Sequence, residues 1–255
     1  MSAAARVLEH NAMVYRRTWR GSVFSTVVSP VFFLASMGIG LGGYVDRSGG
    51  SLAGVSYLVF LAPGLLAAQA MQTAASESTW SVMGKIVWDK TYFAMLATPL
   101  AIRDLLLGEL AWLTVRLTMV AATFLVVMGL FGAIHSPFGL LTLPAAVLTG
   151  LAFGAPIIAF SASQRRDTGF NVLFRFVITP LFLFSGTFFP IERLPGFLQP
   201  VAWVTPLYHG VALTRGLALG RLDPLTGLLH VAVLLGFAAV GVAAGLAVYR
   251  RRLVV

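Results

Sequence analysis

The stretch GLLHVAVLLGFAAVGVAAGLAVYRRR (Gly227–Arg252) decides the fold class. No Asp, Glu, Lys or Arg interrupts it before Arg250. An α-helix needs roughly 20 apolar residues to cross about 30 Å of hydrocarbon, and this run is long enough. Arginines at one end of such a run favour the cytoplasmic side of a membrane. The stretch therefore predicts a membrane-spanning helix whose C-terminal end is cytoplasmic.

The composition of the whole chain agrees with a lipid environment. Of 255 residues, 58% are hydrophobic and only 11% are charged, whereas soluble domains carry about 25% charged residues. This balance argues against a soluble enzyme, a disordered protein and a nucleic-acid-binding domain, despite an isoelectric point near 10.8. Because cysteine is absent, no disulfide framework or thiolate metal site is expected.

Further long apolar runs predict an all-α polytopic membrane protein that forms one domain over residues 1–255. Long continuous runs, rather than segments of about ten alternating residues, argue against an outer-membrane barrel. Six transmembrane helices are expected, at about 22–43, 55–79, 105–131, 138–161, 170–189 and 227–249.

Residues 4–20 have the pattern of an amphipathic helix that lies in the membrane interface. Apolar side chains fall on one side of the helix and charged side chains on the other, and Tyr15 and Trp19 suit the headgroup level. The alternative is a flexible basic tail. We favour the interfacial helix.

Lysine and arginine predict the orientation of the spans. With the N-terminus inside, the inside segments hold Arg6, Arg16, Arg17, Arg20, Lys85, Lys90, Arg103, Arg165, Arg166, Arg250, Arg251 and Arg252. The outside segments hold only Arg47, Arg193, Arg215 and Arg221. The positive-inside rule therefore places both termini in the cytoplasm, and an even number of spans requires the same.

Two polar stretches between the spans are too long for simple turns. Residues 81–103 are amphipathic and cytoplasmic in this topology, and they predict a short helix along the membrane or a plain loop. Residues 190–226 contain apolar pieces separated by prolines, which predict short re-entrant or interfacial outer helices, with an ordinary loop as the alternative.

The sequence contains no catalytic constellation and no metal site. Gly84-Lys85 lacks the remaining residues of a phosphate-binding loop, and the four histidines lack metal-ligand spacing. We therefore expect neither enzymatic activity nor a cofactor on this chain.

Charged residues near or inside the spans are candidates for a translocation path. A charge at the bilayer centre costs at least about 2.5 kcal/mol, so such groups line a polar path or interface, or else snorkel or form static ion pairs. We favour the structural role for Glu77, Glu109 and Arg175, and leave both roles open for Arg116. Aromatic residues offer an apolar lining or simple packing: Phe174, Phe176, Phe182, Phe184, Phe188 and Phe189.

Several segments resemble the ABC-2 type permeases, the membrane subunits of ATP-driven exporters. The similarity is greatest to permeases of nodulation-factor (lipo-oligosaccharide) exporters and related drug exporters. The segments that carry it are GVSYLVFLAPGLLAAQAM (Gly54–Met71), DKTYFAMLATPL (Asp89–Leu100), LLGELAW (Leu106–Trp112), LTGLAFGAP (Leu148–Pro156), ITPLFLFSGTFFPIERLP (Ile178–Pro195) and Pro206-Leu207.

The resemblance implies a coupling helix between spans two and three that contacts a separate ATPase. Its residues would be Asp89, Lys90, Thr91, Tyr92, Phe93, Met95, Leu96, Thr98 and Pro99. Relatives often carry a glutamate where this chain has Phe93, so an apolar contact would replace a polar one. An outer-gate motif is expected at Ser185, Gly186, Pro190, Pro206 and His209.

The main functional hypothesis is a permease in a bacterial inner (plasma) membrane that exports an amphiphilic cargo, either a drug-like molecule or a glycolipid. The resemblance implies two ATPase copies, which bind ATP and magnesium, and a second permease that is identical or paralogous. The alternatives are an ion-coupled secondary transporter and an intramembrane enzyme. Spans one to three do not echo spans four to six, and acidic residues do not cluster at mid-membrane, so neither is favoured.

Overall fold

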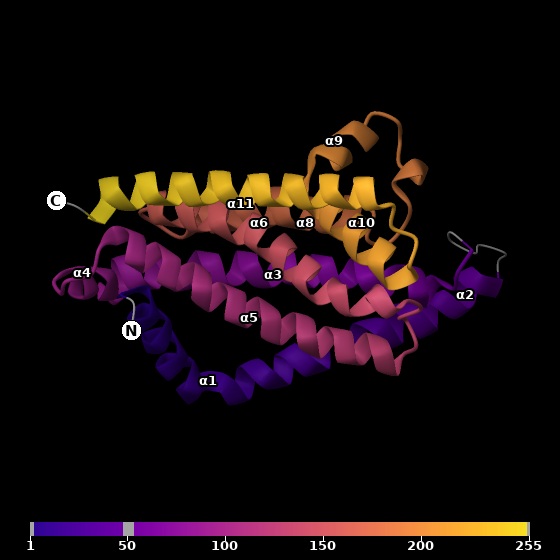
Figure 1. Cartoon of the computed structure of the whole chain (residues 1–255), viewed down its shortest axis with the longest axis horizontal. Coiled ribbons are helices and arrows are strands. Elements are labelled where there is room, and N and C mark those ends of the chain that lie inside the picture. Colours follow the sequence, from indigo (N-terminus) through magenta and orange to yellow (C-terminus); the bar gives the residue numbers. More distant parts are fainter. Residues whose placement is uncertain (1–2, 48–53, 254–255) are drawn as a thin grey trace.

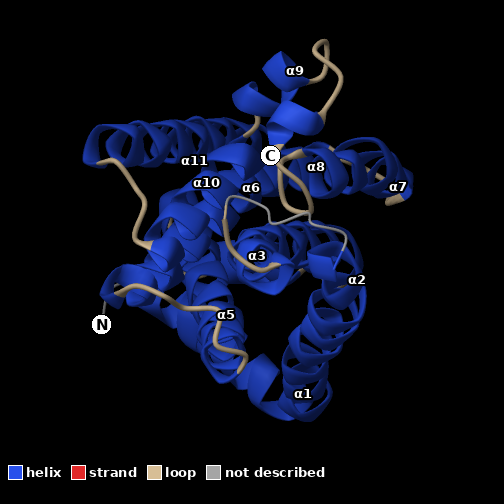
Figure 2. Ribbon diagram, turned by 90° about the vertical axis from the view of Figure 1, so that its right-hand side faces the viewer, coloured by secondary structure: helices blue, strands red, loops and turns tan. Residues whose placement is uncertain are grey.

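The computed structural model describes residues 3–47 and 54–253, and every regular element in these ranges is helical. Helix α4 (Thr91–Leu96) lies at the same end of the molecule as both termini, and α2 (Gly42–Arg47) lies at the opposite end (Figure 1). Helix α3 (Tyr57–Met83) occupies the centre of the bundle (Figure 2). The fold is therefore an elongated helical bundle, as the apolar runs predict.

Within the described ranges, four helical segments are long and apolar enough to cross a membrane. They are Tyr57–Trp88, Ile102–Leu130, Pro137–Ser163 and Pro224–Leu253. They correspond to the spans expected at 55–79, 105–131, 138–161 and 227–249. The apolar window of the first is 78% buried within the chain, whereas that of the last is only 17% buried. The last helix therefore leaves most of its apolar surface free for lipid.

These segments contain helix α3, continued by the π-helix η2 (Gly84–Trp88), and helix α5 (Ile102–Leu130). The 3₁₀ helix η3 (Pro137–Leu141) leads into α6 (Thr142–Ser163), and the last segment is α11 (Pro224–Leu253). Buried side chains such as Leu61, Leu66 and Met71 of α3 lie at the centre of the main hydrophobic core.

The N-terminal segment differs from the expected separate helices at 4–20 and 22–43. Helix α1 runs from Ala3 to Phe33, bends along its length (Figure 1), and continues through the π-helix η1 (Leu34–Leu41) into α2. Residues 4–20 are therefore helical, and no loop separates them from the expected span at 22–43. Side chains 21–27, at the start of the expected span, lie outside the described part of the chain.

The expected span 170–189 is shorter in the structure. A continuous apolar helix covers Thr168–Phe184 and consists of α7 (Thr168–Leu173), the π-helix η4 (Phe174–Ile178) and α8 (Thr179–Phe184). It ends at a turn in which Gly186 has a φ of 81°, a left-handed conformation that glycine adopts without a steric cost. The turn therefore stops the helix five residues before the predicted end.

Residues 190–226 contain short helices rather than an ordinary loop. These are η5 (Ile191–Arg193), α9 (Gln199–Val204) and α10 (Pro206–Leu219). Helix α10 packs against α3, α6 and α11, and its buried residues include Leu207 and Val211.

Asp223 caps the N-terminus of α11, and this contact predicts a pH effect. Its carboxylate accepts hydrogen bonds from the backbone N–H of Thr226 at 3.0 Å and from the Thr226 hydroxyl at 2.9 Å. These bonds lower the pKa of Asp223. The stabilisation is therefore complete above the usual pKa of 3.8 and is lost as the pH falls through the lowered value.

We expect Asp223→Ala to accelerate hydrogen exchange at the first turn of α11, because it removes the cap. Asp223→Asn keeps an acceptor oxygen, so it should retain slow exchange, and the protection relative to the intrinsic exchange rate should no longer depend on pH. Equal exchange in the wild type and Asp223→Ala would contradict the capping role. Exchange followed by mass spectrometry at neutral and acidic pH measures both effects.

Candidate functional site

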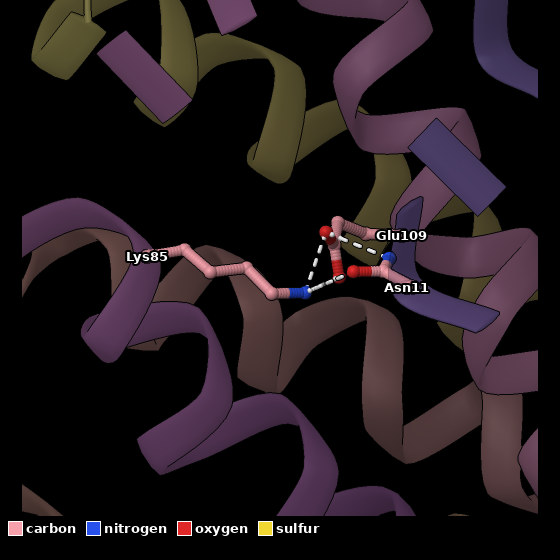
Figure 3. Close-up of polar contacts among 3 residues, drawn as sticks. All are labelled: Asn11, Lys85 and Glu109. Atoms are coloured by element: carbon pink, nitrogen blue, oxygen red, sulfur yellow. Dashed lines mark hydrogen bonds and ion pairs between the residues drawn. The ribbon is translucent and has the colours of Figure 1, made fainter. Parts of the chain in front are cut away.

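A buried polar cluster of Asn11, Lys85 and Glu109 joins three helices (Figure 3). The cluster lies close to α4, because Lys85 approaches the ring of Tyr92. The Nζ atom of Lys85 lies 2.8 Å from both carboxylate oxygens of Glu109 and 2.9 Å from Oδ1 of Asn11. The Nδ2 atom of Asn11 donates to Oε1 of Glu109 at 3.1 Å. Because an ammonium group has three donors, the lysine is fully satisfied.

The cluster links segments that are distant in sequence. Asn11 comes from α1, Lys85 from η2 and Glu109 from α5, and Glu109 is only 5% exposed. A buried carboxylate is costly unless it is paired and hydrogen-bonded, and here it is both. The cluster therefore fixes the N-terminal helix and the segment that leads into α4 to the same point on α5.

The N-terminal helix approaches α5 closely beside this cluster. A Cβ atom at Gly108 would fall 2.5 Å from the Cβ of Val7 and 3.0 Å from the carbonyl oxygen of Ala4. Any larger residue at Gly108 would push the two helices apart. The glycine therefore permits the contact that brings Asn11 within reach of Glu109.

Tyr92 connects α4 to the same region. The side chain of Tyr92 is fully buried. Its ring centroid lies 5.9 Å from the Nζ atom of Lys85 and 5.8 Å from the ring centroid of Tyr249 on α11. Burial, followed by the nearby charge of Glu109, raises the pKa of Tyr92 well above its usual value. Tyr92 is therefore neutral at physiological pH and fixes α4 to the bundle by packing.

The hydroxyl groups of Tyr92 and Tyr249 are buried without a hydrogen-bond partner among the described residues. We therefore expect Tyr92→Phe to leave the free energy of unfolding unchanged or to raise it by up to about 1 kcal/mol, since the substitution removes an unsatisfied polar group. The melting temperature of the purified protein, which should be unchanged or slightly higher, measures this effect. A clear loss of stability would show that the hydroxyl makes a stabilising bond. Tyr249→Phe is the matched variant.

A second ion pair lies deeper along the same helices. The Nε atom of Arg116 on α5 lies 2.9 Å from Oε1 of Glu77 on α3, and its guanidinium lies 4.5 Å from the ring centroid of Tyr15. The ring of Tyr15 also contacts Trp112 edge-on at 5.5 Å. Arg175, in contrast, lies on an exposed face of η4.

A cavity of about 370 Å³ adjoins both ion pairs and is lined by His10, Asn11, Val14, Tyr15, Glu77, Ser81, Lys85, Asp89, Thr91, Trp112 and Arg116.

The predicted coupling residues divide into a buried and an exposed group. Tyr92 is buried, and Thr91, Met95 and Leu96 are partly buried. The exposed residues are Asp89, Lys90, Phe93, Thr98 and Pro99. Trp88, which the sequence interpretation did not select, is 58% exposed, and Phe93 is 38% exposed. We call the exposed residues Trp88, Asp89, Lys90 and Phe93 the end ridge, and two of its four residues are large and aromatic.

At the opposite end of the bundle, Arg215 on α10 binds two segments of the chain. Its Nε atom donates to the carbonyl oxygen of Phe60 at 3.0 Å, and its Nη2 atom donates to those of Gly186 at 2.8 Å and Thr187 at 3.2 Å. The guanidinium carbon also lies 3.7 Å from the ring centroid of Phe60. Arg215 therefore holds the turn after α8 against the start of α3.

The expected outer-gate residues gather around this turn. Buried Ser185 lies 3.4 Å from the hydroxyl of Thr205, and the Nδ1 atoms of His209 and His230 lie 2.8 Å apart, so that one donates and the other accepts. Pro190 immediately precedes η5, and Pro206 begins α10. Among the described residues, no group of three His, Asp or Glu side chains is placed to hold a metal ion.

The aromatic path candidates do not form one surface. Phe182 and Phe188 contact each other at 5.1 Å between ring centroids, and both contact Phe33 of α1. Phe184 is 43% exposed, whereas Phe189 packs against the small cluster around Ile191. The structure therefore brings Phe182 and Phe188 together with α1, whereas Phe184 and Phe189 lie apart from this contact.

Glu109 is identifiable from the sequence as a charge near a span, but its partners are not. Lys85 was counted as an inside charge and rejected as part of a phosphate-binding loop, and Asn11 carried no signal, because neither contact follows from helical spacing. Arg215 was counted only as an outside charge. Its position within an apolar stretch was the signal that pointed to a satisfied, partly buried role.

Comparison with known proteins gives a consistent result along the chain. The family model for the ABC-2 type transporter matches residues 6–219. "Nodulation protein J" of Rhizobium leguminosarum bv. viciae is 32% identical over 248 residues, which cover 97% of this chain and 93% of that protein. The protein of the same name from Rhizobium meliloti (strain 1021) is 32% identical over 248 residues, covering 97% and 92%. That of Rhizobium leguminosarum bv. trifolii is 34% identical over 215 residues, covering 84% and 80%.

Proposed function

The chain belongs to the ABC-2 type transporter family, and from this membership we propose that it is the permease subunit of an ATP-driven exporter of an amphiphilic cargo. It is an integral membrane protein whose family works with an ABC ATPase. In this proposal two ATPase copies hold the ATP and magnesium, and a second permease, identical or paralogous, completes the path. The cargo is a drug-like molecule or a glycolipid.

The proposed topology has six crossings with both termini in the cytoplasm. The four long helices provide four of them, and the continuous segment α1–η1–α2 and the helix Thr168–Phe184 provide the others. Support comes from the distribution of basic residues and from the position of both termini at the same end of the bundle as α4 (Figure 1). Helices α9 and α10 then lie on the outer side.

The observation that carries the proposal is the end ridge. It exposes Trp88 and Phe93 beside α4, at the end of the bundle that is cytoplasmic in this topology. Directly behind it, Tyr92 packs on Tyr249, and Lys85 is bound to Glu109. A displacement of the end ridge would therefore be transmitted to α1, α5 and α11 through buried contacts, as a coupling element requires.

We expect Phe93→Asp to weaken association with the partner ATPase at least tenfold, because it replaces one of the two exposed aromatic side chains of the end ridge with a charge. Co-purification and ATP turnover of the reconstituted complex measure the effect. Phe197→Asp is the matched control, since Phe197 is 76% exposed in the outer region. Undiminished association and ATP turnover of Phe93→Asp would contradict the assignment of the end ridge.

A further inference from the structure

The helix Thr168–Phe184 carries a polar stripe on an otherwise apolar exposed face. Asn171, Arg175 and Thr179 follow one another at intervals of four residues, and all three are exposed. The helix lies at the periphery of the bundle (Figure 2). Its middle section, η4, is a π-helix, and such wide turns inside helices occur frequently at functional sites.

Arg175 makes no hydrogen bond or ion pair with any residue that the structure describes. The glutamates of α3 and α5 are already paired, because Glu77 binds Arg116 and Glu109 binds Lys85. The unneutralised charge on this helix is therefore positive. An unpaired cation within a membrane span is costly, so it needs an anionic partner.

The surroundings of Arg175 suit the two ends of an amphiphile. A surface hollow of about 660 Å³ is lined by Asn171, Val172, Phe174, Arg175, Phe176 and Thr179. Because side chains on a helix point toward its N-terminus, the guanidinium lies toward the cytoplasmic half in the proposed topology. Exposed apolar residues continue toward the other end, namely Phe176, Val177, Leu183 and Phe184. The charged site and the apolar track thus match the orientation of an amphiphile from the inner leaflet.

We propose that this stripe is a cargo site for an anionic single-chain amphiphile, whose carboxylate, sulfate or phosphate ester binds Arg175 while its chain lies along Phe176 and Leu183. Asn171 and Thr179 offer additional donors to the anionic group. The proposal rests on the proposed exporter function, which it deepens by assigning the charge of the cargo.

The test uses the permease alone in phosphatidylcholine vesicles with two spin-labelled probes of equal chain length, ionised stearate and a trimethylammonium amphiphile. We expect the wild type to prefer stearate about fivefold in the immobilised electron-spin-resonance component, the order expected for one partly screened charge pair. Arg175→Gln should abolish the preference, and Arg175→Lys should retain most of it. Arg193→Gln is the matched control at an exposed outer arginine and should behave as the wild type.

An equal preference in Arg175→Gln and the wild type would overturn the proposal, provided that the variants keep the melting temperature of the wild type. If Arg175→Gln melts below the wild type, Arg175→Lys decides the outcome, because a stable variant that keeps the charge but loses the preference for stearate would also overturn the proposal. Replacing part of the phosphatidylcholine with phosphatidylglycerol separates the two sources of anion. If an equal amount of phosphatidylglycerol displaces stearate, the site binds lipid headgroups and the cargo assignment is overturned. If stearate stays bound, the result supports the cargo assignment. Because no ATPase is present, the result is independent of the association test of the end ridge.

Discussion

Replacing Lys85 with Met should destabilise the permease by about 3–5 kcal/mol, because Glu109 would remain buried and charged without its cation. The carboxylate is only 5% exposed and would keep one short-range partner, Asn11. At about 2 °C per kcal/mol, the melting temperature of the purified protein should fall by at least 6 °C. Static light scattering or fluorescence during heating measures this change.

The chain supplies its own control, since its second lysine, Lys90, is exposed. Lys90→Met should change the melting temperature little, as is usual for surface substitutions. In the double variant Lys85→Met/Glu109→Gln, the buried charge is removed and a hydrogen bond to Asn11 is kept, so most of the stability should return. A single variant that melts as the wild type does, or a double variant as unstable as the single one, would contradict the account.

The double variant also separates stability from coupling. If the cluster transmits the motion of the ATPase as proposed, the restored protein should still show reduced transport, since no ion pair then links η2 to α5. Full transport together with full stability would limit the cluster to a role in folding.

The positions of the long helices were predictable because hydropathy is a local property of the chain. Gly227–Tyr249, for example, requires no knowledge of any other segment to be identified as a span, and α11 contains it entirely. The end of the helix at Phe184 was not predicted, since an apolar run continues beyond it through Phe188 and Phe189. The helix ends at a turn in which Gly186 is left-handed, and composition does not reveal that conformation.

The charged contacts were less predictable, because they join residues that are far apart in sequence. Glu109 and Arg116 lie on the same face of α5, as their spacing predicts, yet each pairs with a different segment. Glu109 binds Lys85 of η2 and Asn11 of α1, and Arg116 binds Glu77 of α3. Their partners follow from how the helices pack, which no single segment specifies.

Arg215→Leu should lower the stability by about 3 kcal/mol, because three carbonyl oxygens each lose a hydrogen bond worth about 1 kcal/mol. Those oxygens belong to Phe60, Gly186 and Thr187. Arg215→Lys should recover little of the loss. A lysine ammonium donates from one nitrogen atom. It cannot reproduce the planar guanidinium, which bridges α3 and the turn and also stacks on Phe60.

The melting temperature should therefore fall by about 6 °C in both variants, at about 2 °C per kcal/mol. Arg193→Leu, at an exposed position, should leave it unchanged. A lysine variant as stable as the wild type would show that charge alone suffices. Arg215 also lines a cavity of about 260 Å³ that includes Ser185, Gly186, Pro190 and Tyr208. In the proposed exporter, loosening this turn should therefore reduce release of cargo while association with the ATPase at the opposite end stays intact, because no contact of Arg215 reaches the end ridge.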